Sequence, residues 1–397
     1  MKKLLLFLGC LLLSYSYGQA QVNIHTAQIE AFHNLMNYVE EKAGGKLTCK
    51  NANEVELQTA FDKNSVDSKL NALIDSLLNS SAQYLPKVIE NVNARLYSEK
   101  AAKGKEAYKV AFTVLPDFCI NMTAGMPEIW VEYWNNEHRE LVENTIAELN
   151  TNIEDVLENI KSELEVLLPD DIDMNSEQNI HLVVDGNRGG YQFDNHILMD
   201  VIYGDLTDFS LFISVLKHEM HHAYYRQWFV EKMSNKERSE IDSYLYEYQR
   251  GFIFEGLAQR YDLPFASKEI KQMFANKDLI VELFDEWISV MRLAKGDSPQ
   301  TALAIVQNQY GDIAVERLKR YWQGSTPPTS YANRPTVTYY VSYNLYNSIF
   351  ESGGYKKLKY VIENPDKLLL VYNELYTDSM LVPRIPDDIV MMWQSNF

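Results

Sequence analysis

The stretch from Leu211 to Phe229, LFISVLKHEMHHAYYRQWF, contains three of the eight histidines of the chain within five residues. Mostly apolar residues surround these histidines, which predicts a helix that is largely buried. A buried imidazole or carboxylate costs free energy unless it is hydrogen-bonded, paired or bound to a metal ion. The crowding of such groups on one helix therefore needs a chemical explanation.

The motif H-E-x-x-H offers that explanation. His218 and His222 lie four residues apart, so their imidazoles project from the same face of a helix. Two nitrogens in that arrangement can bind one Zn²⁺ at about 2.0–2.1 Å. Glu219 lies one step round the helix and can reach a water beside the metal. His221 projects about 100° away from His222, and we interpret it as a structural or surface residue.

A candidate for the third metal ligand lies downstream, in the apolar stretch GFIFEGLAQRYDLP. Glu255 follows His222 by 33 residues, and an ionised carboxylate in apolar surroundings is costly unless it is paired or bound to a metal. Gly256 removes a side chain where another backbone or a ligand could come close. The alternative is a buried ion pair of Glu255 with Arg226 or Arg250.

Residues 1–20, MKKLLLFLGCLLLSYSYGQA, have the pattern of a secretory signal peptide. Lys2 and Lys3 precede an apolar run that is shorter than the roughly 20 residues needed to cross a bilayer. We therefore expect an exported protein, periplasmic or secreted, with no membrane span in the mature chain. We do not expect lipid anchoring at Cys10, because the apolar run continues past this cysteine.

Charge and cysteine content restrict the possible partners and suggest one cross-link. The formal net charge of -18 argues against nucleic acid as a partner, because phosphate binding needs clustered Lys and Arg. Loss of the signal peptide would leave Cys49 and Cys119. A disulfide between them is a hypothesis for an exported chain, with two free thiols as the alternative.

Hydrophobic spacing divides the mature chain into two regions. Apolar residues three and four apart predict an N-terminal helical region over 21–168, which ends before Pro169. Two β-rich segments follow at 179–184 and 191–203, and the glycine-rich DGNRGG between them predicts a small hairpin or sheet. Helices return near Asp208.

The second region, 178–397, is predicted to carry the chemistry and to end in a helical C-terminal part. A Pro-rich loop at 324–336 interrupts its helices. The predicted fold class is therefore α+β and predominantly helical. The remaining histidines are scattered singly, and we interpret them as surface or core residues. His196, in the strand before the metal helix, is the one that we would test.

The combination of H-E-x-x-H with a later E-G-x-A resembles the gluzincin zinc metallopeptidases. Over 179–354, the glycine hairpin, HEMHH, FEGLAQRY and the late YYVSY are similar to secreted bacterial zinc-dependent peptidases. The resemblance implies a gluzincin-like catalytic core with a small sheet beside the H-E-x-x-H helix. It implies one Zn²⁺ per chain, held by His218, His222 and Glu255.

The resemblance also implies the reaction. It predicts zinc-dependent hydrolysis of peptide bonds in a peptide or protein substrate, with a zinc-activated water and Glu219 as general base. In such enzymes the strand before the metal helix pairs with extended substrate, which here would be the segment 191–203.

Two positions depart from the pattern of the family. Gln259 stands where some gluzincins have a carboxylate that orients a zinc histidine, so that hydrogen bond would lack charge. The late motif usually reads Tyr-x-x-Gly, and Ser342 takes the place of the glycine. We predict Tyr339 as the catalytic phenol that donates to the developing oxyanion, with Tyr340 as the alternative. A role in an aromatic core is equally open for these tyrosines.

Two functions are alternatives to a zinc peptidase. A catalytically inactive gluzincin-like binding module is suggested by Gln259. A carboxylate-bridged di-iron protein would use two Glu-x-x-His pairs on bundle helices, here Glu30 with His33 and Glu219 with His222. The di-iron interpretation leaves His218 and the FEGLAQ stretch unexplained.

Overall fold

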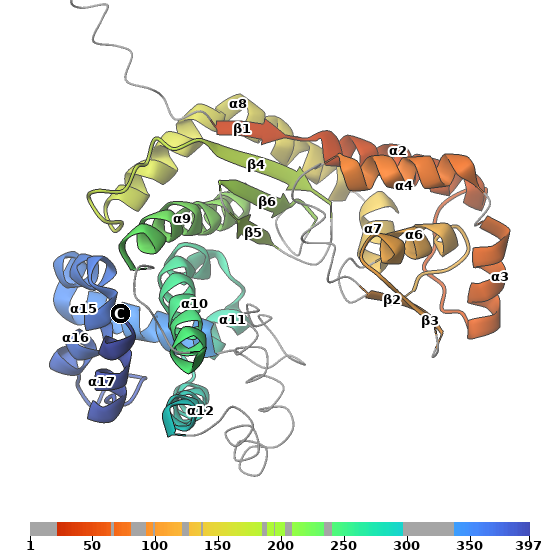
Figure 1. The fold of residues 1–397 in the computed structure, drawn as a ribbon. Helices are drawn as coiled ribbons and strands as arrows, with labels where there is room; N and C mark the ends of the chain where they lie inside the picture. Colours follow the sequence, from red (N-terminus) through yellow and green to blue (C-terminus); the bar gives the residue numbers. More distant parts are fainter. Residues whose placement is uncertain are drawn as a thin grey trace, which may run out of the picture. The chain divides into compact units, whose positions relative to one another are not determined.

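The structure is a computed structural model, and it describes residues 22–64, 67–80, 93–97, 100–120, 127–135, 138–184, 189–193, 195–202, 209–233, 240–296 and 337–397. The described chain is predominantly helical and carries one four-stranded and one two-stranded sheet (Figure 1). The predicted α+β class is therefore confirmed. The predicted signal peptide and the predicted loop at 324–336 lie outside the described residues.

The larger sheet has the strand order β1-β4-β6-β5. Its strands are β1 (Val22–His25), β4 (Gln178–Val183), β6 (His196–Asp200) and β5 (Gly190–Phe193). β1, β4 and β6 run parallel, and β5 runs antiparallel to β6. In the described part of the chain β5 therefore forms one edge of this sheet, and β1 forms the other.

Segments 179–184 and 191–203 were predicted to form a small hairpin or sheet, and the sheet is confirmed: the two segments lie in one sheet but do not form a hairpin with each other. β4 pairs with β6 in parallel, and the hairpin lies within the second segment, where Phe193 pairs with His196. The chain turns at Asn195, a residue type favoured in tight turns. The turn between antiparallel strands therefore lies at Asn195 and not at the glycine-rich stretch where we predicted it.

The N-terminal region is not wholly helical as predicted, because it also contains β1 and a small antiparallel hairpin. The hairpin consists of β2 (Asn93–Tyr97) and β3 (Lys100–Lys103). The helices are α2 (Ala27–Ala43), α3 (Glu54–Asn64), α4 (Ser68–Asn79), α6 (Lys105–Val114), α7 (Pro127–Asn135) and α8 (His138–Glu165).

A core of aromatic side chains and one disulfide stabilise this region. Phe32, Phe112 and Trp130 are fully buried, and the rings of Phe112 and Trp130 stack 4.6 Å apart. Cys49 and Cys119 form a disulfide. The hypothesis of this cross-link is therefore confirmed.

The C-terminal region is a set of packed helices. They are α9 (Phe209–Met233), α10 (Glu240–Asp262), η1 (Leu263–Phe265), α11 (Lys268–Phe274), α12 (Lys277–Gly296), α15 (Val337–Glu363), η2 (Pro365–Lys367), α16 (Leu368–Leu375) and α17 (Asp387–Asn396). The buried rings of Phe252 and Trp287 stack 4.9 Å apart in its core. α15 changes direction at Gly354, whose φ of 66° is the left-handed conformation that glycine adopts most readily.

The contacts between residues group the chain into two compact units. One comprises residues 1–156 and 173–219, and the other comprises 157–172 and 220–397. Both α8 and α9 contribute residues to each of the two units. Within the described residues, none of the helices combines the length and apolarity that crossing a membrane requires.

Candidate metal centre

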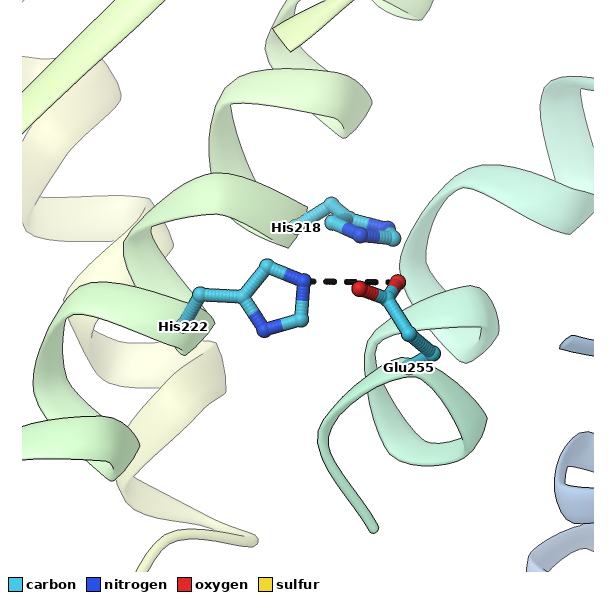
Figure 2. Close-up of side chains that lie close together, drawn as sticks. All are labelled: His218, His222 and Glu255. Atoms are coloured by element: carbon cyan, nitrogen blue, oxygen red, sulfur yellow. Dashed lines mark ion pairs between the residues drawn. The ribbon is translucent and has the colours of Figure 1, made fainter. Parts of the chain in front are cut away.

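α9 presents two imidazoles side by side. Leu216 and Met220 are fully buried, and their burial orients the helix so that His218 and His222 project together toward α10 (Figure 2). The two histidines are only 6% and 9% exposed. The structure thus gives the H-E-x-x-H spacing the shared orientation that the sequence predicted.

Glu255 of α10 completes a group of three. The apolar residues Phe252 and Leu257 are fully buried on the same helix, and the carboxylate of Glu255 is directed toward the histidines of α9 (Figure 2). Its Oε2 lies 3.5 Å from Nε2 of His222. This approach brings the carboxylate within ion-pairing distance of one of the two imidazoles.

The donor set fits zinc. The three ligand atoms of His218, His222 and Glu255 all lie within 4.8 Å of one another. Two imidazole nitrogens and one carboxylate oxygen are a usual set for a catalytic zinc ion, which leaves a fourth position for water or substrate. Among the residues that the structure describes, this is the one group of three or more ligating side chains with such spacing.

Glu219 lies beside the edge strand. Its side chain is only 7% exposed. A β-carbon placed on Gly190 of β5 would lie 2.6 Å from Cγ of Glu219 and 2.7 Å from its Oε1. The carboxylate that we predicted as general base therefore rests against bare backbone of β5. The sequence did not reveal this neighbour, because the packing of β5 against Glu219 is a tertiary contact.

His221 is a core residue. It is fully buried, and its ring centroid lies 5.4 Å from that of Tyr225 and 5.8 Å from that of Tyr261. The surface interpretation of His221 is therefore wrong, and the structural one is confirmed.

Gly256 and Ser342 explain how closely α10 and α15 approach. A β-carbon on Gly256 would lie 2.6 Å from Cβ of Ser342 and 2.8 Å from its backbone carbonyl carbon. Ser342 is fully buried, and its hydroxyl donates to the carbonyl oxygen of Thr338. The prediction that Gly256 makes room for another backbone is confirmed.

The two tyrosines that precede Ser342 differ in their surroundings. The ring of Tyr340 stacks on that of Phe274 with centroids 4.1 Å apart. Burial raises the pKa of the Tyr340 phenol. Tyr339 is half-buried. Tyr340 thus has the aromatic packing role that the sequence left open.

The di-iron interpretation receives no support from the described residues. Glu30 is exposed, and Nε2 of His33 lies 2.8 Å from the hydroxyl of Tyr133.

Gln259 lies on α10 one turn after Glu255 and is only 8% exposed. A neutral amide therefore occupies the buried position where some gluzincins have a carboxylate.

Three histidines that we interpreted singly lie in a row on the larger sheet. His25 of β1 stacks on His181 of β4 with ring centroids 4.5 Å apart. Nε2 of His181 lies 3.0 Å from Nδ1 of His196 on β6. Burial, together with the positive charge that His25 and His196 can carry, lowers the pKa of His181 to about 4. The alternation of side chains along strands could have suggested the row only if the order of the strands had been known.

Comparison with known proteins adds one finding. A family model described as "Putative zinc dependent peptidase (DUF5700)" matches residues 105–379, well over half of the chain. No curated protein and no solved structure matches the chain. The matched span includes all three residues that could hold a metal ion.

Proposed function

Because the chain belongs to this family of zinc-dependent peptidases, we propose that it hydrolyses peptide bonds with the help of a bound zinc ion. In this proposal His218, His222 and Glu255 hold the zinc ion, as the corresponding ligands do in gluzincins. The observation that carries the proposal is the convergence of the three ligand atoms within 4.8 Å, next to a buried Glu219. When bound there, zinc would supply Lewis acidity toward the peptide carbonyl and would lower the pKa of water.

Glu219 performs the proton transfers in this proposal. Its carboxylate accepts a proton from the attacking water and delivers it to the amine that leaves. In the fold this side chain is buried and lies against β5 at Gly190. The orientation of a catalytic group contributes strongly to the rate.

β5 is the proposed binding strand for an extended peptide substrate. Among the strands that the structure describes, β5 lies at the edge of the sheet and contacts Glu219, whereas β6 is internal. In recognition by strand addition, an extended peptide adds to the edge of a sheet through main-chain hydrogen bonds. This assignment replaces the segment 191–203 with Gly190–Phe193 alone.

Tyr339 is the proposed donor to the developing oxyanion. The packing of Tyr340 on Phe274 supports this choice between the two tyrosines. We expect Tyr339→Phe to lower kcat by roughly 100-fold, by analogy with the loss of one oxyanion donor. Tyr340→Phe is the matched control, and we expect it to retain kcat. A larger loss of kcat in the control would reverse the assignment.

Substitution of Glu219 tests the reaction. We expect Glu219→Gln to bind zinc like the wild type and to lose roughly 10²–10⁴-fold in kcat toward a peptide library, because the amide cannot accept the proton of water. Zinc content and cleavage are measured on the same samples, with a chelator as a second control. Wild-type cleavage by the variant would refute the general base. A zinc-loaded wild type that cleaves no peptide would favour the inactive binding module.

We also propose that the protein is exported. The Cys49–Cys119 disulfide supports this, because disulfides persist mainly in oxidising compartments. N-terminal sequencing of the protein from its native cells should find a chain that begins after about residue 20, where signal peptides of this kind end. A cytoplasmic chain that retains its first residues would contradict export.

A further inference from the structure

Gly190 lies directly against the side chain of Glu219. A β-carbon on Gly190 would lie 2.6 Å from Cγ, 2.7 Å from Oε1 and 2.9 Å from Cδ of Glu219. Non-bonded carbon atoms prefer separations of about 3.5–4.0 Å. Any side chain at position 190 therefore displaces the carboxylate of Glu219 or is itself displaced.

The obstacle at Gly190 is a flexible side chain. The three nearest atoms all belong to the outer part of the Glu219 side chain, which can rotate away. The φ of Gly190 lies outside the left-handed region, so an alanine can adopt the same backbone conformation. At Gly256, by contrast, one of the nearest atoms is backbone of Ser342. A methyl group at position 190 should therefore move the carboxylate and leave the fold intact.

We propose that Gly190 is a positioning residue for the general base. Its bare backbone lets the Glu219 carboxylate rest against β5, the strand to which we assign the extended substrate. The base is thereby held beside the strand along which the peptide would lie. This inference rests on the proposed peptidase function, and it goes beyond that function in assigning a role to a residue outside the ligand set and the acid-base group.

The variant Gly190→Ala tests the role. We expect it to keep the wild-type zinc content and unfolding midpoint and to lose about 100-fold in kcat, with KM little changed, since a displacement of about 1 Å can cost that much. Gly251→Ala is the matched control. It adds the same methyl group at a position where nothing lies within 4 Å, and we expect it to retain kcat.

A double variant separates positioning from general damage. If Gly190 acts through Glu219, then adding Gly190→Ala to Glu219→Gln should cause no further loss of kcat, because residues that act as one unit are not additive. Additive losses would overturn the proposal, and so would a wild-type kcat in Gly190→Ala alone.

A crystal structure of Gly190→Ala provides a readout without activity. We expect the Glu219 carboxylate to have left its place against β5, while His218 and His222 keep theirs. If the wild type cleaves no peptide, the peptidase function fails, yet this structure still tests the positioning role. An unmoved Glu219 beside Ala at position 190 would overturn it.

Discussion

Two glycines make the close contacts around the candidate metal centre possible. Gly190 admits the side chain of Glu219, and Gly256 admits the backbone of α15 at Ser342. In both places a β-carbon would lie within 3.0 Å of several atoms, closer than packed atoms tolerate. The two contacts differ in the atoms that a new methyl group would displace: side-chain atoms of Glu219 at Gly190, and backbone as well as side-chain atoms of Ser342 at Gly256. This difference predicts different consequences for substitution.

Substitution of Gly256 should destabilise the fold. Because the methyl group of Gly256→Ala would meet backbone of Ser342, α10 and α15 must separate, and overpacking of this kind costs about 1–3 kcal/mol of the free energy of unfolding. Gly251→Ala on the same helix is the control. It meets nothing within 4 Å and should stabilise by up to about 1 kcal/mol through helix propensity. Urea unfolding of both variants checks this, and equal stabilities would contradict the explanation.

The proximity of the three candidate ligands could be predicted in part from local signals. His218 and His222 share a helix face whatever the rest of the fold does, and a carboxylate in an apolar helix marked Glu255. The contact of Gly190 with Glu219 was not predictable, since it depends on which strand occupies the edge position of the sheet. The burial of His221 had a similar cause, because helical phase alone does not reveal what packs on each face.

At the scale of elements, long helices were easier to predict than short strands. The helical period of apolar residues in α8 and α12 identifies these elements without tertiary information. β1 has only four residues, VNIH, and it is defined by its pairing with β4, more than 150 residues away along the chain. The parallel pairing of β4 with β6 likewise has no local signal, which is why the sequence could not decide between a hairpin and a sheet.

The row of histidines on β1, β4 and β6 should make stability depend on pH. The pKa of His181 is lowered in the fold from 6.5 to about 4, so the unfolded chain binds more protons between these values. The free energy of unfolding therefore decreases as pH falls from about 6.5 to about 4, by up to about 1.4 kcal/mol per pH unit. Two charged imidazoles could no longer share the contact between Nε2 of His181 and Nδ1 of His196.

The variant His181→Gln tests this dependence. It removes the titrating group, so the loss of stability between pH 7 and pH 5 should be smaller than in the wild type. Urea midpoints at the two pH values provide the comparison, and measurement at pH 7 alone controls for the substitution itself. An equal loss in both proteins would show that His181 does not cause the pH dependence.

At the scale of the molecule, the candidate metal site draws on two helices that are separated along the chain. α9 supplies His218 and His222, and α10 supplies Glu255, after a segment of more than 30 residues. A ligand that binds only the folded state stabilises that state in proportion to the logarithm of its concentration. Zinc would therefore hold α9 and α10 together in addition to supporting hydrolysis.

The zinc content of the purified, folded chain tests the central claim most directly. After equilibration with buffered zinc, we predict one zinc ion per wild-type chain, as one three-ligand site requires. We expect its loss in Glu255→Ala and its retention in His25→Ala, which removes an exposed imidazole outside the group. A folded wild type that takes up no zinc, or a Glu255→Ala variant that binds it as tightly as the wild type, would contradict the account.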